Sequence, residues 1–422
     1  MRQGKILISW ERFVAFLFSL SPFLSLYRFP FIGVNVAFFP YSFLFVITIV
    51  RGGEKKQNVK AIVTPLIVTM FCYCVFSLSL VEQSAIYNLK RTNFSSICTT
   101  FSFITLSLIA FYNEKIRDCY RKNVENIAII MSFVVVGQYI FYYVFHTTIT
   151  VDRSFLLPLK SLFTNDVVYY LSVSGMLSHG MFRPSAFFLE PSHFSQFCSI
   201  GLASLLIRKD NIINPKAIFV TIGIILTTSG IGILTVIMLW GYVLVMNDRK
   251  LSKKVLIRII TGAFFLSLMF VVFYMTSSAF RLAILRITTE YSGYSSAIEG
   301  RLWSRSLLEE LSGTEKWFGT GFRNIPVYGV NKIAYYMTGI VELFYCQGII
   351  GASIFCIMYL MIFSKAYRSV DRIAAIMLVA YLPFLIGGDC LGALRLCHYI
   401  PFMYIKKKRV MNGESIYISE SA

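Results

Sequence analysis

Charged side chains are scarce in this sequence. Asp, Glu, Lys and Arg make up 14% of its 422 residues, whereas a soluble chain carries roughly 25%. Hydrophobic residues make up 56%, so the chain lacks the polar surface that a fold in water requires. The composition therefore excludes a water-soluble globular domain.

Several motifs that carry chemistry are also missing. There is no Walker A sequence, which argues against an ATP-driven pump, and no DxD triplet of the kind that holds a metal with a nucleotide sugar. The nine cysteines form no CxxC pair. The histidines do not cluster at metal-ligand spacing; they are His146, His179, His193 and His398. We therefore expect no metal site, no disulfide framework and no cofactor.

What the sequence does contain is a series of apolar runs of about 20 residues, the length that crosses ~30 Å of hydrocarbon. These runs predict an all-α fold, a polytopic transmembrane helical bundle of about 12 spans. The expected spans are 13–28, 31–50, 61–81, 97–112, 124–146, 185–207, 217–228, 231–246, 255–276, 334–363, 373–387 and 394–405.

The net charge of +19 is explained by basic residues in the short connections between these runs, and not by a nucleic-acid partner. When the connections are assigned alternately to two sides, 26 of the 40 Lys and Arg residues fall on one side. The positive-inside rule makes that side the cytoplasm and places both termini there. The same rule divides residues 217–246 into two short spans at Ser229-Gly230, because one span would separate two basic segments.

Two of the connections are long, and both fall on the outer face. Loops of this length are uncommon unless they have a function. The expected organisation is five N-terminal spans (1–146), a first large loop (147–184), four spans that include the short broken pair (185–276), a second large loop with a helical segment (277–333), and three C-terminal spans with a basic tail (334–422).

The first candidate site is the segment FRPSAFFLEPSHFSQF (182–197), where the first large loop meets a span. Arg183, Glu190 and His193 are costly at the mouth of an apolar segment unless they face a cavity or one another. Pro191 suits the first turn of a helix, whose free amides can hold an anion. The alternative is structural: Glu190 would cap the helix and Arg183 would extend to the interface.

The second candidate site is the second large loop, which is rich in arginine, the side chain that binds phosphate in a bidentate manner. Arg301 and Arg305 are four residues apart and share a face if their segment is helical. Arg286 and Arg323 lie in the same loop. We interpret GTGF (319–322) as a turn before Arg323, not as a phosphate loop. The alternative is an ordinary solvated helix with Glu–Arg pairs.

Taken in order, four segments of the chain resemble the Wzy-type O-antigen and capsular polysaccharide polymerases. They are RPSAFFLEPSHFSQF (183–197), TTSGIGILTVI (227–237), GRLWSRSLLEELSGTEKWFGTGF (300–322) and GIVELFYCQGIIGASIFCI (339–357). The resemblance covers about residues 180–360, and the first five spans are similar to the family only in number and hydropathy.

The resemblance implies a metal-independent membrane glycosyltransferase at the periplasmic face of the bacterial inner membrane. The growing glycan would be transferred from undecaprenyl pyrophosphate to the next lipid-linked repeat unit. The implied catalytic residues are Arg183, Glu190, His193 and Arg301, and the implied pyrophosphate or glycan ligands are Arg305, Arg323 and Arg286. The expected partners are the undecaprenyl-pyrophosphate-linked oligosaccharide, membrane lipid, a chain-length regulator and a flippase, with no nucleic acid.

Two other functions remain open. An O-antigen ligase has a similar layout, but ligases resemble one another in a histidine of the large outer loop, and residues 277–333 contain none. A lipid-linked oligosaccharide flippase, which is a transporter, usually has short loops throughout and repeated halves, and neither holds for this sequence. Both features favour the polymerase.

The charge distribution generates a topology that labelling can test. Single reporter cysteines or fusions at positions 160 and 315 should be accessible from outside, and those at positions 55, 118, 250 and 407 should be accessible only from the cytoplasm. Labelling of positions 212 and 250 from opposite faces would contradict the division at Ser229-Gly230.

Overall fold

The computed structural model is helical apart from four strands of two residues each among the residues that it describes. This confirms the expected all-α fold. The structure describes residues 10–24, 36, 42, 59–60, 63–79, 94–147, 182–188, 190–207, 214–246, 271, 274–275, 281, 306–322, 327–328, 333–334, 338–367, 373–387, 398–402 and 405–406.

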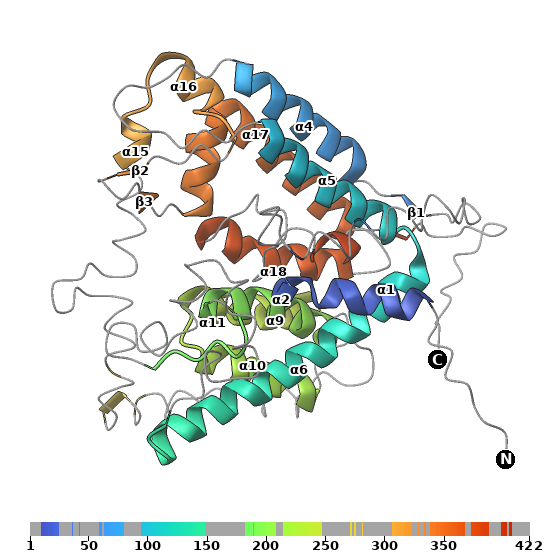
Figure 1. The fold of residues 1–422 in the computed structure, drawn as a ribbon, viewed down its shortest axis with the longest axis vertical. Coiled ribbons are helices and arrows are strands. Elements are labelled where there is room, and N and C mark those ends of the chain that lie inside the picture. Colours follow the sequence, from blue (N-terminus) through green and yellow to red (C-terminus); the bar gives the residue numbers. More distant parts are fainter. Residues whose placement is uncertain are drawn as a thin grey trace.

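The first group of helices packs around α9 (Pro191–Ile207), in the lower half of Figure 1. Its other members are α1 (Trp10–Ser19), α2 (Ser21–Leu24), α6 (Glu114–Val144), α10 (Pro215–Leu226) and α11 (Gly230–Met246). α9 contacts α6, α10 and α11, and residues 194–206 are all buried. Gly201 permits the close approach of α6, because a side chain there would overlap Ala128. Small residues at such contacts are typical of helices that pack within membranes.

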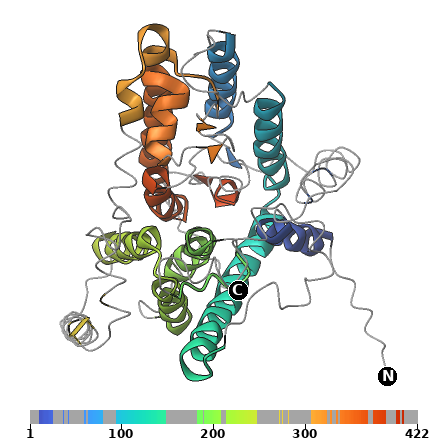
Figure 2. The ribbon, with the colours of Figure 1, turned by 60° about the vertical axis from the view of Figure 1, so that its left-hand side comes forward.

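The second group is built on α17 (Gly339–Tyr367), in the upper half of Figure 1. Its other members are α4 (Val63–Ser79), α5 (Phe94–Ala110), α15 (Ser306–Glu309) and α16 (Gly313–Phe318). Helix α18 (Ile373–Gly387) lies between the two groups, as Figures 1 and 2 show, and it contacts α17 as well as α9 and α11. Residues 374–381 of α18 are all buried. The two groups therefore share one hydrophobic core.

Short antiparallel ladders join segments that are distant in the sequence. β1 (Val59–Lys60) pairs with β4 (Ile405–Lys406), and β2 (Val327–Tyr328) pairs with β3 (Ile333–Ala334). The 3-10 helix η4 (Ile400–Phe402) contacts α5 and α18. The end of the chain therefore returns to elements from its beginning.

Most of the expected spans that fall on described residues are helical. Helices α4, α5, α10, α11 and α18 match the expected spans 61–81, 97–112, 217–228, 231–246 and 373–387. The expected division of residues 217–246 is confirmed, because α10 ends at Leu226 and α11 begins at Gly230. The five-part organisation of the chain and the count of about 12 spans stay predictions.

Four expectations about the helices are wrong. The expected span 185–207 becomes helical only at Pro191, because residues 185–188 form a turn. The expected span 13–28 is interrupted at Leu20, between α1 and α2. The expected connection 113–123 is helical, because α6 begins at Glu114. The expected span 394–405 is not a continuous helix: η4 and β4 occupy much of its described part, and Pro401 lacks the amide that a helix interior needs. The expected spans 31–50 and 255–276 lie outside the described residues, apart from isolated positions.

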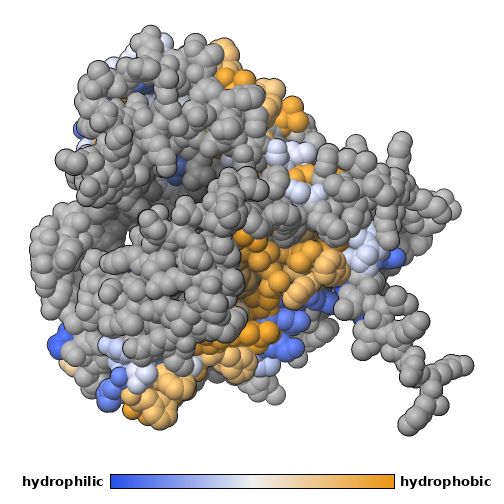
Figure 3. Space-filling model, viewed as in Figure 1, coloured by the Kyte–Doolittle hydropathy of each residue, from blue (hydrophilic) through white to orange (hydrophobic). Residues whose placement is uncertain are grey.

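Two helices in the described part of the chain, α6 and α17, are long and apolar enough to cross a membrane. Figure 3 shows apolar side chains exposed over α1 and at the lower end of α6. The exposed large apolar side chains of α6 include Ile140, Phe141 and Val144. Apolar side chains that face outward on long helices are expected where lipid replaces water, so these helices support the expected membrane protein.

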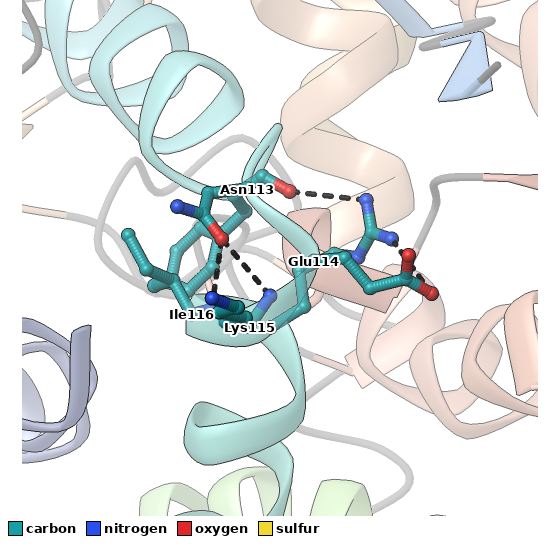
Figure 4. Close-up of polar contacts among 6 residues, drawn as sticks. Asn113, Glu114, Lys115 and Ile116 are labelled. Carbon is teal, nitrogen blue, oxygen red and sulfur yellow. Dashed lines mark hydrogen bonds and ion pairs between the residues drawn. The ribbon is translucent and has the colours of Figure 1, made fainter. Parts of the chain in front are cut away.

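The long helix α6 is polar at its beginning and apolar at its end. Its N-terminus is capped by Asn113, whose side-chain oxygen accepts hydrogen bonds from the amides of Lys115 (2.9 Å) and Ile116 (3.4 Å), as Figure 4 shows. No charged residue occurs in residues 127–144, which extend over about 27 Å. The capped, charged end therefore explains why the helix begins before the apolar run.

Helix α17 is kinked at Gly348, where the backbone is left-handed (φ 63°) and the regular helical hydrogen bonds are interrupted. The carbonyls before the kink are bonded to other segments. The amide of Thr320 donates to Tyr345 (3.0 Å), and the amide of Gly321 donates to Cys346 (3.1 Å). The Tyr73 hydroxyl of α4 donates to the carbonyl of Gln347. The GTGF segment (319–322) thus forms the expected turn, and its amides bind peptide carbonyls.

Replacement of Gly348 by Ala should destabilise the fold. A Cβ at this position would overlap the backbone of Trp317 and Gly319, and the left-handed backbone disfavours a side chain. We expect a loss of about 1–3 kcal/mol, measured as a lower thermal unfolding midpoint of the purified protein in detergent.

The matched control is Gly241→Ala in α11, where an added Cβ meets no atom within 4 Å. This variant should be as stable as the parent or slightly more stable, because Ala favours helix more than Gly does. Equal unfolding midpoints for the two variants would show that the kink does not need glycine.

Candidate functional site

The candidate site is centred on the N-terminus of α9. Pro191 is the first helical residue, and the carbonyl of Glu190 accepts the amide of Phe194 (3.1 Å). The side chain of Glu190 is half-buried and accepts a hydrogen bond from the Ser192 hydroxyl (3.0 Å). Proline at the first helical position removes one of the amides that would lack a helical partner, and the remaining amides give this end a positive potential.

Residues 182–188, which we call the site segment, lead into this helix and are folded tightly. The Ser185 hydroxyl donates to the carbonyl of Phe188 (2.8 Å), and the amide of Phe188 donates back to the carbonyl of Ser185 (2.9 Å). Ala186 adopts a left-handed backbone (φ 51°), which is uncommon for a residue other than glycine. Arg183 is half-buried within this segment. The turn at residues 185–188 therefore begins two residues after Arg183.

The inner side of the site segment packs on aromatic rings. Phe188 lies 5.0 Å from Phe23 of α2, 5.7 Å from Phe194 and 5.6 Å from Phe197, measured between ring centroids. The ring of Phe197 in turn meets that of His398 at 5.4 Å. These ring contacts anchor the end of the site segment to α2 and to the first turns of α9.

The break between α10 and α11 lies beside the first turns of α9. The Ser195 hydroxyl, which donates to the carbonyl of Pro191 (2.8 Å), lies 3.4 Å from the Thr227 hydroxyl at the end of α10. A side chain at Gly232 would overlap Ser195, so α11 also begins in direct contact with α9. The Ser229 hydroxyl accepts the amide of Gly232 (3.3 Å) and thereby caps α11.

The segments that were singled out from the sequence thus form two pairs. Residues 182–197 contact the break in residues 227–237, and residues 306–322 contact the kink of α17. Of the expected site residues, Arg183, Glu190 and His193 are described, and all three are half-buried. Glu190 and His193 lie at the beginning of α9, and Arg183 lies in the site segment before it. The other expected site residues lie outside the described residues: Arg286, Arg301, Arg305 and Arg323.

Two residues that contact the site were missed by the sequence reasoning. Gln138 and Tyr142 of α6 hold the site segment, through hydrogen bonds to Ala186 and a stacked ring on Phe182. The available signal was Gln138 itself, a polar residue within an apolar run, which is costly in a membrane unless it has a partner.

The arrangement can bind an anion and exchange a proton. The amides of the first turn of α9 and the guanidinium of Arg183 are groups that suit a phosphate. Glu190 and His193 are groups that can accept a proton from a hydroxyl. No group of three or more potential metal ligands occurs among the residues that the structure describes. Comparison of the chain with protein-family models and with curated protein sequences gives no match.

Proposed function

We propose that the chain is a polymerase that joins lipid-linked oligosaccharide repeat units at the periplasmic face of the bacterial inner membrane. The observation that supports this proposal is the tightly folded site segment, which carries the half-buried Arg183 and leads into α9, where Glu190 and His193 are also half-buried. The resemblance of residues 180–360 to Wzy-type polymerases supports the same assignment.

The proposed reaction makes one bond and breaks one bond at the same carbon. A hydroxyl oxygen of the next repeat unit attacks the anomeric carbon of the growing glycan, and the bond from that carbon to the undecaprenyl pyrophosphate oxygen breaks. Negative charge then develops on the departing pyrophosphate. Arg183 and the amides of the first turn of α9 would stabilise that charge, and Glu190 or His193 would accept the hydroxyl proton.

Further positive charge would come from the second large loop. In this loop, Arg301 is proposed as a catalytic residue. The proposed ligands of the pyrophosphate or glycan are Arg305, Arg323 and Arg286. Because pyrophosphate is a good leaving group, the reaction needs no metal ion to proceed. A flippase that supplies the repeat units and a regulator of chain length are proposed partners.

Substitution of Arg183 or Arg301 by Lys should impair polymerisation nearly as strongly as substitution by Ala. Lys keeps the charge but cannot form the two parallel hydrogen bonds that Arg makes to a phosphate. Loss of one such contact in the transition state lowers the rate on the order of 10²–10³-fold. In cells, gel analysis of the surface polysaccharide should show chains that stop at one repeat unit, with the protein at its normal level.

The control for this experiment is Arg12→Ala. Arg12 is an exposed residue of α1 that lies outside the candidate site. This variant should retain the full ladder of chain lengths. Normal ladders from Arg183→Lys and Arg301→Lys at equal protein level would show that these arginines only support the fold.

Polymerisation should be insensitive to chelators. The purified protein, supplied with lipid-linked repeat units, should extend chains equally well with and without EDTA, because the proposed charge stabilisation comes from arginine and backbone amides. Activity that is lost in EDTA and restored by Mg²⁺ or Mn²⁺ would contradict this mechanism.

A further inference from the structure

Gln138 binds both backbone groups of a single residue in the site segment. Its side-chain oxygen accepts the amide of Ala186 (3.0 Å), and its side-chain nitrogen donates to the carbonyl of Ala186 (3.4 Å). Gln138 is 3% exposed and belongs to the apolar part of α6. Ala186 lies three residues after Arg183 and four residues before Glu190, so this contact fixes the middle of the stretch that joins them.

A second contact from α6 holds the beginning of the same segment. Tyr142, one helical turn after Gln138, stacks on Phe182 with ring centroids 4.2 Å apart and planes 10° apart. The ring of Tyr139 meets the edge of Phe182 at 5.8 Å. Phe182 directly precedes Arg183, so α6 contacts the chain immediately before Arg183 and again three residues after it.

The chemistry of the Gln138–Ala186 contact suggests more than a contribution to stability. A glutamine in an apolar helix is costly, and a packed Leu or Met would fill the same space without that cost. An amide side chain offers in exchange one donor and one acceptor at a fixed separation, which match one residue's carbonyl and amide. Such a pair fixes the backbone in position and orientation, which a purely apolar contact does not.

We propose that Gln138 is a positioning residue, which sets the placement of Arg183 and Glu190 relative to the reacting pyrophosphate through its two hydrogen bonds to Ala186. The kinetic part of this inference rests on the proposed function. A displacement of catalytic groups by about 1 Å can cost on the order of 100-fold in rate, so loss of these bonds affects turnover even where the fold persists.

The contact itself is tested without any activity assay. Hydrogen–deuterium exchange is measured for the peptide that contains Ala186 in the full-length protein in detergent. In Gln138→Met, which keeps the volume of the side chain but removes both bonds, exchange of the Ala186 amide should accelerate about tenfold. Gln138→Asn, which keeps the amide group but is one methylene shorter, should behave like Gln138→Met.

The matched control is Ser132→Ala, on the same helix. Ser132 is also fully buried, but its hydroxyl donates to Ala128 within α6 and does not contact the site segment. This variant should leave exchange at Ala186 unchanged. Gln138→Met and Gln138→Asn leave two buried backbone groups without a partner, so both should lower the thermal unfolding midpoint, whereas Ser132→Ala should not. Exchange in peptides of α10 and α18 should keep the parent's rate, so that faster exchange at Ala186 reports the local contact.

The positioning role is tested by kinetics of chain extension on lipid-linked repeat units. Gln138→Met should lower kcat on the order of 10-fold to 100-fold and change KM little. In an Arg183→Ala background the same substitution should have a much smaller effect, because a residue that acts through Arg183 has little left to position. A merely structural residue would instead give the same fold-change in both backgrounds.

The outcomes separate this inference from the proposed function. Unchanged exchange in Gln138→Met, normal kcat despite faster exchange, or equal effects in the two backgrounds would each overturn the positioning role. If the parent protein extends no chains, the proposed function fails and the kinetic role of Gln138 fails with it, whereas the exchange measurement still decides whether Gln138 holds the segment.

Discussion

Backbone groups that cannot reach water must find partners inside the protein, and this constraint governs three of the irregular segments described above. At Gly348 the carbonyls before the kink are bonded by amides of residues 320–321 and by Tyr73. Between α10 and α11, Ser229 caps the new helix. In the site segment, Gln138 bonds Ala186. At Gly348 and in the site segment, the partner comes from another element. These two irregular segments therefore also hold separate elements together.

Helix α18 connects the two helix groups that contain these irregular segments. It is apolar throughout and is buried between α17 on one side and α9 and α11 on the other. The Tyr359 hydroxyl of α17 donates to the carbonyl of Leu378 in α18 (2.5 Å), which joins these two helices by a hydrogen bond. The helices that carry the site segment and the GTGF turn are thus held against the same central element.

Hydropathy located α10, α11 and α18 well, because lipid-facing and buried helices differ from their connections in composition alone. The start of α6 was missed because its charged first turns look like a connection, although Asn113 caps them. Arg183 and Glu190 could be selected from the sequence because ionisable side chains are costly at the end of an apolar segment. Gln138 is visible in the sequence as a polar residue in an apolar run, but its partner could not be predicted, because the backbone of Ala186 lies 48 residues away and a backbone partner leaves no signal in residue type. The roles of Arg301, Arg305, Arg286 and Arg323 stay predictions.

The polar cluster around His398 has a consequence for how the chain is assembled. The two ring nitrogens of His398 lie 2.9 Å from the Tyr120 hydroxyl and 3.4 Å from the Ser21 hydroxyl, the second pair being 377 residues apart in the sequence. During synthesis α1, α2 and α6 are complete long before His398 emerges from the ribosome. The contacts of His398 can therefore form only after the last part of the chain has been synthesised, and contacts of such long range are slow to form. Packing of His398 against α2 and α6 is thus a late step in the assembly of the first helix group.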